Sequence, residues 1–294
     1  MAEHRTASES RTPADGASAV VGVVLAAGKG TRMRSARPKV LHEVAGRPML
    51  DWVLDALEAA GCGRTLVVVG HQAEAVRQAC AKRELTWVEQ RQQLGTGHAL
   101  AQVESHLVGA ATLLVVSGDV PLVTPQTLSR LAEAATRAWG SMAVARLDDP
   151  RSLGRVAVRA DGGLDRIVEA ADASAEELAL RTVNAGLYAL PAPDVFAQLG
   201  AIGADNAKGE IYLTDALSRA VAAGGRVELV ELDDPAEAWG VNDQVELARL
   251  HRLMIGRHLE TLAAGGVTVL EPERTVIEPG VGVGAGTVVH PGVS

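Results

Sequence analysis

A glycine-rich turn near the start of the chain carries the first residues that could do chemistry. The stretch LAAGKGTRMRSARPKVLHEVAG covers residues 25–46 and follows the apolar run VVGVV. Between Gly28 and His42 lie five cations and no acid, although the whole chain has a formal net charge of −8. Glycines let backbone N–H groups approach phosphate oxygens, and nearby cations supply countercharge. The turn therefore predicts a nucleotide or sugar-phosphate site, with a solvent-exposed basic loop as the alternative.

Two common phosphate-binding motifs do not fit this turn. The Walker pattern requires Ser or Thr after its lysine, whereas Lys29 is followed by Gly30. The dinucleotide pattern GxGxxG requires a third glycine where the chain has Met33. The position of the turn still favours a ligand site, because loops after parallel strands bind ligands in open sheets.

The composition of the chain argues against several classes of protein. It has 294 residues, is 47% hydrophobic and 22% charged, and contains only 2% aromatic residues. These values are ordinary for a soluble globular protein whose core is mostly Val, Leu, Ala and Ile. The acidic balance argues against nucleic-acid binding, and no apolar run is long enough to suggest a membrane span. Cys62 and Cys80 lack a CxxC spacing, so we expect buried structural thiols and a cytoplasmic protein.

Apolar runs of strand length alternate with helical patterns in the first half of the chain. Strands are expected at 20–27, 65–70, 85–90 and 112–119, and helices at 48–61, 73–83, 97–107 and 124–139. This order predicts an α/β fold, a Rossmann-like mixed and mostly parallel sheet with helices on both faces. The loops after the strands would then share one edge of the sheet.

The pattern changes after residue 140. A strand at 141–147 is followed by a hairpin signal around Asp161-Gly162-Gly163, and further elements are expected at 182–190, 210–225, 227–234 and 244–266. We interpret this half as an insertion that extends the first sheet and forms one wall of a cleft. In the last segment, Ile277, Val283 and Val289 recur every six residues, as in the coils of a parallel β-helix. A flexible Gly/Val-rich end is the alternative.

Eight motifs together resemble one family. LAAGKGTRMRSARPKVLHEVAGRPM resembles the signature of sugar-1-phosphate nucleotidyltransferases, and most closely the uridyltransferase half of the bifunctional GlmU type. Further matches keep the family's order over roughly residues 20–265: EQRQQLGTGHA, SGDVPL, LDDPRSLGRV, RIVEAADA, VNAGLY, NAKGEIYLTD and WGVNDQVEL. The resemblance implies a Mg²⁺-dependent reaction of UTP with N-acetyl-α-D-glucosamine 1-phosphate. Its products would be UDP-N-acetylglucosamine, for cell-envelope precursors, and pyrophosphate.

The resemblance also implies roles for four residues that come from distant parts of the chain. Arg32 and Lys39 would be catalytic, with Arg32 on the leaving pyrophosphate and Lys39 on the α-phosphate. Asp119 and Asn242 would bind Mg²⁺, which prefers hard oxygen ligands. The alternatives are a turn or cap residue for Asp119 and a helix N-cap for Asn242.

Substrate contacts are expected along the rest of the cleft. The triphosphate would lie on the turn, the uracil on the loop after the third strand, and the sugar on the hairpin side. The residues expected to bind these substrate groups are Leu25, Ala26, Ala27, Gly28, Gln90, Gly95, Thr96, Gly154, Glu169, Asn184 and Asn242. The alternatives are a helix cap for Thr96 and a solvated edge acid for Glu169, while Tyr212 and Thr214 either line the sugar wall or cap a helix. The family often has a basic pair after this glutamate, where the chain has Ala170-Ala171.

The same resemblance predicts how the chain is divided. We expect a disordered tail at 1–18, a nucleotidyltransferase domain at 19–243, a connecting helix at 244–266, and a truncated start of a left-handed parallel β-helix at 267–294. The family's acetyltransferase activity belongs to a long β-helix and is not expected here, while a homotrimer is possible. Small molecules are the expected partners, with no nucleic acid and no membrane. Use of dTTP, GTP or glucose 1-phosphate, and a non-catalytic nucleotide-sugar sensor, are the alternatives.

Overall fold

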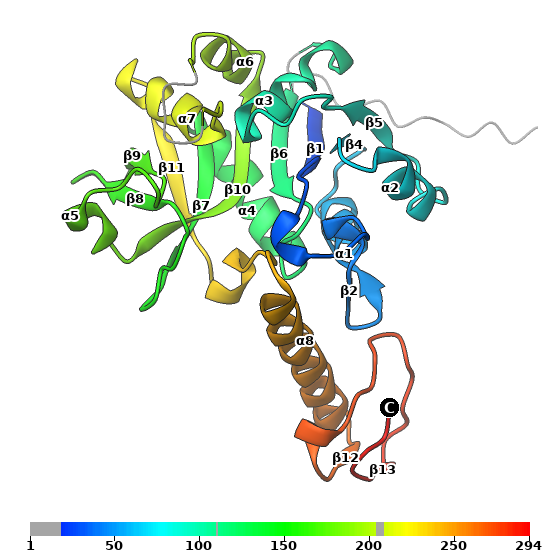
Figure 1. Ribbon diagram of the computed structural model, residues 1–294. Helices are drawn as coiled ribbons and strands as arrows, with labels where there is room; N and C mark the ends of the chain where they lie inside the picture. The colour runs from blue at the N-terminus through cyan, green and yellow to red at the C-terminus, as the bar shows by residue number, and fades with distance from the viewer. Residues whose placement is uncertain (1–18, 110, 204–208) are drawn as a thin grey trace, which may run out of the picture.

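The computed structural model describes residues 19–109, 111–203 and 209–294 (Figure 1). The expected tail at 1–18 lies outside the described residues, as does part of the NAKGEIYLTD match.

A mixed sheet forms the body of the molecule (Figure 1). In the described part of the chain it has nine strands; seven follow the order β11-β7-β10-β6-β1-β4-β5, and β8 pairs with β10 and β9. Their bounds are β1 Ala19–Ala26, β4 Arg64–Val69, β5 Thr86–Glu89, β6 Ala111–Ser117, β7 Gly140–Arg146, β8 Arg155–Val158, β9 Leu164–Val168, β10 Thr182–Ala192 and β11 Val227–Glu231. β10 runs antiparallel to β6, β7 and β8, whereas β6, β1, β4 and β5 are parallel. The expected mixed α/β sheet is confirmed.

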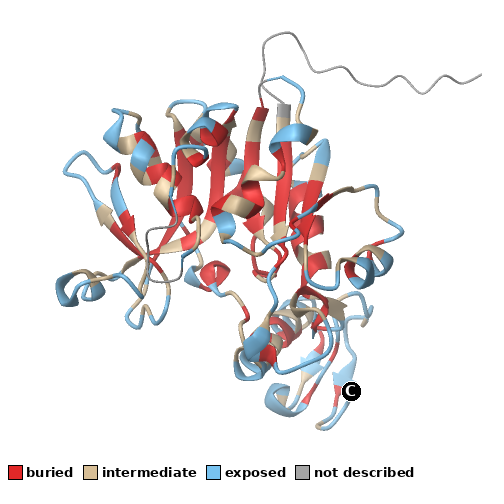
Figure 2. Cartoon of the chain, turned by 45° about the horizontal axis from the view of Figure 1, so that its top comes forward, coloured by how far each residue is buried: buried red, intermediate tan, exposed pale blue. Residues whose placement is uncertain are grey.

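Helices cover both faces of this sheet, as the alternating sequence pattern predicts. The core on one face contains α1 (Met49–Ala59), α2 (Ala73–Ala79) and α4 (Pro125–Ala135). The core on the other face contains α3 (Thr96–Ala101), α6 (Asp194–Leu199) and α7 (Leu213–Ala222). Figure 2 shows the strands and the inward helix faces buried and the outer surfaces exposed. The aliphatic composition is thus sufficient to fill two layers against the sheet.

Some elements differ from the expectation. The helix expected at 97–107 ends at Ala101 and is followed by the 3₁₀ helix η3 (Glu104–His106), and the short elements β2 (Glu43–Val44), β3 (Arg47–Pro48) and α5 (Ala175–Leu178) were not foreseen. Cys80 lies directly after α2 rather than inside the helix expected at 73–83, and it is buried as expected. Cys62, which follows α1, is only partly buried. Burial raises the pKa of both thiols to about 11.

The long helix α8 (Gln244–Ala264) leads away from the sheet toward the last residues (Figure 1). It begins at Asp243, whose carboxylate accepts hydrogen bonds from the N–H groups of Val245 and Glu246. Beyond it come the 3₁₀ helix η5 (Pro272–Arg274) and the parallel pair β12 (Thr268–Val269) and β13 (Val288–Val289). The β-helix interpretation of this segment stays a prediction. Among the described residues, no helix is both long enough and apolar enough to span a bilayer.

A buried carboxylate joins the second half of the sheet to α4. Glu237 lies in the 3₁₀ helix η4 (Pro235–Ala238) and is only 3% exposed. Its two oxygens accept hydrogen bonds from the N–H and hydroxyl of Thr124 and from the hydroxyl of Thr127, at 3.0–3.1 Å. Thr124 is the N-cap of α4, so this acid fixes the segment that leads to Asn242 against the start of that helix.

Substitution of this carboxylate tests that link. Glu237→Ala should lower the free energy of unfolding by about 2–3 kcal/mol, because buried donors lose a charged acceptor. The matched control is Glu133→Ala, which removes an exposed α4 acid bonded to Arg137 and should change stability by at most about 0.5 kcal/mol. Chemical denaturation measures both, and equal losses would contradict the proposed role of the buried acid.

Candidate active site

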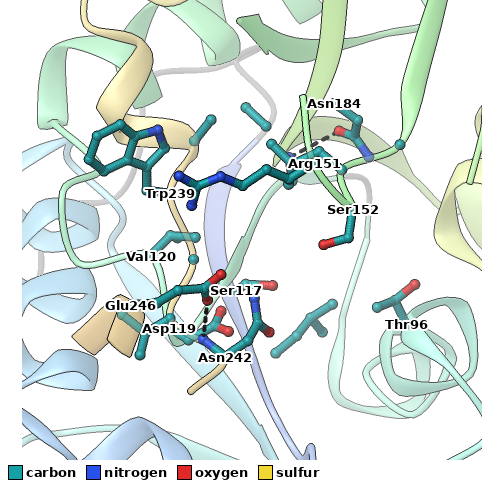
Figure 3. A pocket seen from close by; sticks show the side chains of 18 of the residues that line it. Thr96, Ser117, Asp119, Val120, Arg151, Ser152, Asn184, Trp239, Asn242 and Glu246 are labelled. Atoms are coloured by element: carbon teal, nitrogen blue, oxygen red, sulfur yellow. Dashed lines mark hydrogen bonds between the residues drawn. The ribbon is translucent and has the colours of Figure 1, made fainter. Parts of the chain in front are cut away.

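The strand order reverses between β1 and β6, and a cavity of about 430 Å³ lies at their carboxyl ends (Figure 3). A crevice at this point is the usual ligand site of an open α/β sheet. Seven of the predicted site residues line it: Leu25, Thr96, Asp119, Gly154, Glu169, Asn184 and Asn242. The structure therefore brings together residues from both halves of the chain.

The glycine-rich turn places two of its cations, Arg32 and Lys39, at the edge of this cavity. Arg32 lies on the 3₁₀ helix η1 (Thr31–Met33) and Lys39 begins the 3₁₀ helix η2 (Lys39–Leu41). Gly30 has a φ of +59°, and a Cβ there would lie 2.8 Å from the Cβ of Lys39. Only glycine permits both the left-handed backbone and this close approach. Gly30 therefore sets the path of the turn around the stem of Lys39.

A compact polar cluster joins three distant segments. The ammonium of Lys39 forms an ion pair with Asp119 and donates a hydrogen bond to Asn242 Oδ1 at 3.0 Å. Arg32 Nη2 donates to the same amide oxygen at 2.9 Å. The Lys39 and Asp119 side chains are only 16% and 18% exposed, so solvent screens the pair weakly. One cation thus contacts both the carboxylate and the amide to which the family resemblance gives a metal-binding role.

The backbone fixes these two oxygen donors independently of Lys39. Asp119 follows β6 through Gly118, whose N–H donates to Leu25 O at 3.0 Å. The N–H of Val241 donates to Asp119 O at 3.1 Å, which places Asn242 beside the end of β6. Asn242 is not the N-cap of α8, because Asp243 fills that position. That alternative is wrong, and the Asn242 side chain is turned to Arg32 and Lys39 instead.

The donor set fits a hard divalent ion that shares its coordination with a substrate. Among the described residues, no three His, Cys, Asp or Glu side chains gather into a metal-binding group. Asp119 instead supplies a carboxylate and Asn242 an amide oxygen, and both groups contact the Lys39 ammonium. Mg²⁺ commonly takes one or two protein oxygens and completes its shell with phosphates and water.

The predicted base-binding residues lie together on one side of the cavity. Gln90 follows β5, is 2% exposed, and donates from Nε2 to Gly95 O at 3.2 Å. Gly95 has a φ of +106°, and a Cβ there would lie 2.5 Å from the carbonyl oxygen of Ile211. Thr96 does not cap its own helix α3; its hydroxyl accepts from the N–H of Leu213, at the start of α7. The loop therefore docks rigidly onto the N-terminus of α7.

An irregularity in β10 shapes the opposite wall. The register of β10 with β7 shifts between Asn184 and Tyr188, and Gly186 lies between them with a φ of +72°. The Gly186 N–H donates to Asn184 Oδ1 at 3.0 Å, while Asn184 Nδ2 donates to Tyr188 Oη at 2.7 Å. Burial raises the pKa of the Tyr188 phenol well above its usual range, so the group stays neutral. The bulge directs the Asn184 amide into the cavity (Figure 3).

Glu169 lies on the same wall. Its Oε1 accepts from the Thr214 hydroxyl at 3.1 Å, and a Cβ on Gly154 would lie 3.6 Å from both carboxylate oxygens. Glu169 is therefore not simply a solvated edge acid, and the lack of a side chain at Gly154 keeps its carboxylate accessible from the cavity. Thr214 lines the cavity, whereas Tyr212 lines a neighbouring hollow.

Not every predicted residue borders the cavity. Ala26 and Ala27 are buried at the end of β1 and beyond it, and Gly28 is exposed on the turn. Gln90 and Gly95 support Thr96 without lining the cavity, and Arg32 and Lys39 reach it through their contacts with Asn242.

Sequence reasoning missed several residues that do line the cavity. They are chiefly Ser117, Arg151, Ser152, Trp239, Glu246 and Arg249. In Figure 3 the Arg151 guanidinium extends across the cavity toward Trp239. Arg151 has a φ of +47°, unusual for a residue other than glycine, and the buried Arg155 donates to its carbonyl at 3.1 Å. Arg151 lies in the motif LDDPRSLGRV, three residues before Gly154, so the same motif carries the signal for both residues.

Comparison with known proteins is consistent with this geometry. A sequence model of the MobA-like NTP transferase domain matches residues 22–220. The chain belongs to the MobA-like NTP transferase family. A structure described as UDP-glucose pyrophosphorylase complexed with UDP-glucose superposes on this chain with a TM-score of 0.66 at 18% identity, covering 80% of this chain and 98% of the other. At this identity the superposition supports the fold alone.

Three curated relatives carry the name "Bifunctional protein GlmU". The chain is 46% identical to that of Syntrophotalea carbinolica over 274 residues, which are 92% of this chain and 59% of the relative. It is 46% identical to that of Burkholderia thailandensis over 252 residues, which are 86% of this chain and 56% of the relative. It is 41% identical to that of Pelobacter propionicus over 280 residues, which are 94% of this chain and 61% of the relative. The predicted resemblance is confirmed, and the chain spans less than two thirds of these relatives' length.

The two glycines of the turn provide a matched test of its geometry. Gly30→Ala should lower the free energy of unfolding by about 1–3 kcal/mol, because it adds left-handed strain and a contact with Lys39. Gly28→Ala should change it by at most about 0.5 kcal/mol, since a Cβ there meets no atom within 4 Å. Denaturation without ligand compares them, and a greater loss in Gly28→Ala would contradict this account.

Proposed function

We propose that the chain is a sugar-1-phosphate uridyltransferase that joins UTP and N-acetyl-α-D-glucosamine 1-phosphate. The observation that carries the proposal is the cluster of Arg32, Lys39, Asp119 and Asn242 at the edge of a cavity lined by Glu169 and Asn184. The cluster supplies cations and hard oxygens for phosphates, and the opposite wall supplies polar groups suited to sugar hydroxyls and an N-acetyl group. The choice of base and sugar rests on the similarity to the GlmU relatives.

The proposed reaction makes specific demands on these side chains. An oxygen of the sugar phosphate attacks the α-phosphorus of UTP, a new P–O bond forms, and the α–β anhydride bond breaks to release pyrophosphate. The attacking phosphate is already ionised, so no side chain need remove a proton. The main barrier is repulsion between two anions, and Lys39 on the α-phosphate and Arg32 on the leaving pyrophosphate offset the developing charge.

Asp119 and Asn242 would hold Mg²⁺, which would contribute further neutralisation of the phosphate charge when bound. Gln90, Gly95 and Thr96 would present the base-binding side, where backbone and amide groups can match the donors and acceptors of a uracil edge. We also propose the division into a transferase domain at 19–243, a connecting helix at 244–266 and an incomplete β-helix segment at 267–294.

A substrate panel tests this function. Purified chain with Mg²⁺ should release pyrophosphate fastest with UTP and N-acetylglucosamine 1-phosphate, when UTP, dTTP and GTP are each combined with N-acetylglucosamine 1-phosphate and glucose 1-phosphate. A faster reaction with another pair would reassign the specificity within the family. Nucleotide-sugar binding without pyrophosphate release from any pair would instead support a non-catalytic sensor.

Removal of the predicted metal-binding carboxylate should stop the reaction without unfolding the protein. Asp119→Ala should lower kcat/KM by about 10²–10³-fold or more, because the site loses the carboxylate that would hold Mg²⁺ beside the phosphates. The control is Asp165→Ala on β9, whose carboxylate contacts the neighbouring Arg166 at the surface and should leave turnover unchanged. Pyrophosphate release is measured for both after thermal unfolding verifies the fold. Full activity of Asp119→Ala would remove this residue from the mechanism.

A further inference from the structure

The cation position between Asp119 and Asn242 is filled by a group of the protein itself. Lys39 Nζ pairs with the Asp119 carboxylate and donates to Asn242 Oδ1 at 3.0 Å. Arg32 Nη2 donates to the same Asn242 oxygen at 2.9 Å. An amide oxygen has two lone pairs, so these two donors use its accepting capacity. One Asp119 carboxylate oxygen, Oδ2, and the Asn242 amide oxygen are therefore both engaged by cationic side chains.

A divalent ion cannot join this arrangement without displacing the ammonium. Unit charges of like sign about 4 Å apart repel by about 4 kcal/mol at an effective dielectric constant near 20, and a double charge increases this. The Lys39 and Asp119 side chains are mostly shielded from water, so solvent relieves little of that repulsion. The lysine stem is flexible, although its base is held against Gly30, so the ammonium can swing while the backbone stays fixed.

We propose that Lys39 is a built-in counter-ion that blocks the metal site of the free enzyme until a triphosphate draws its ammonium away. The inference rests on the proposed function and assigns a regulation to the same site. The triphosphate offers Lys39 and Arg32 alternative anionic partners, and their departure exposes the oxygens of Asp119 and Asn242. Metal and nucleotide then bind with positive coupling, which by linkage acts equally in both directions.

The arrangement would also protect the fold of the empty site. Asp119 and Asn242 approach from segments far apart in the sequence, and without a cation the partly buried Asp119 carboxylate would lack countercharge. Lys39 supplies that charge when no substrate is present. A purely structural ion pair, with the metal bound elsewhere, is the competing explanation, and metal binding by the free protein separates the two.

The test is a titration of the nucleotide-free chain with Mn²⁺, in which electron paramagnetic resonance reports the unbound ion. Lys39→Met, which removes the charge at similar length, should bind Mn²⁺ about 5–150-fold more tightly than the unaltered chain. Lys39→Gln should show the same gain in Mn²⁺ affinity, and it replaces Lys39→Met in the titration if Lys39→Met does not fold. Lys39→Arg, which keeps the charge, should leave the weak Mn²⁺ binding unchanged.

Two controls locate the ion. Lys29→Met removes an exposed cation from the same turn and should leave Mn²⁺ affinity unchanged. Adding Asp119→Asn to Lys39→Met should abolish the gain. Unchanged or weaker Mn²⁺ binding by folded Lys39→Met or Lys39→Gln would overturn the proposal, as would an equal gain in Lys29→Met. The titration needs no turnover, so its outcome is separate from that of the substrate panel.

Discussion

The site depends on an ionic link in which the Lys39 ammonium holds the Asp119 carboxylate and the Asn242 amide. These residues come from the turn after β1, the end of β6 and the segment before α8. No one of the three segments forms a site alone. The link is weakly screened because its side chains are mostly buried, and the backbone hydrogen bonds of Gly118 and Val241 keep Asp119 and Asn242 in place independently of it. The other parts of the cavity are the loops that position these three residues and the opposite wall, which carries Glu169 and Asn184.

The supports are made of backbone rather than side chains, and this explains where glycine occurs. Gly30 allows the turn to pass close to the stem of Lys39, and Gly95 allows the base-side loop to lie against Ile211. Each has a positive φ and a close approach that a Cβ would block. The result is a cavity whose polar side chains are placed by fixed loops, as electrostatic preorganisation requires.

The sequence predicted the sheet, the covering helices and the convergence of residues near both ends of the chain. Periodicity and apolar runs carry the information on the sheet and its helices, because burial on a sheet face has a regular pattern. The convergence of the site residues was implied instead by the resemblance of the motifs to the nucleotidyltransferase family. The bulge in β10 and the reach of Arg151 could not be predicted, since both depend on tertiary contacts. Asn184 is directed by a register shift, and Arg151 is held in a left-handed conformation by the loop around buried Arg155.

The count of cations in the turn also overstated the charge available to a phosphate. Arg37 pairs with Glu43 at 2.7 Å, and Lys39 pairs with Asp119, so two of the five cations are compensated within the protein. Arg32 differs, because its partner Asn242 is neutral and leaves its charge uncompensated by that contact. The electrostatic attraction for an incoming anion therefore depends on which pairs can open. Release of Lys39 would add a positive charge beside the phosphates at the moment when one is required, which a permanently exposed lysine could not do.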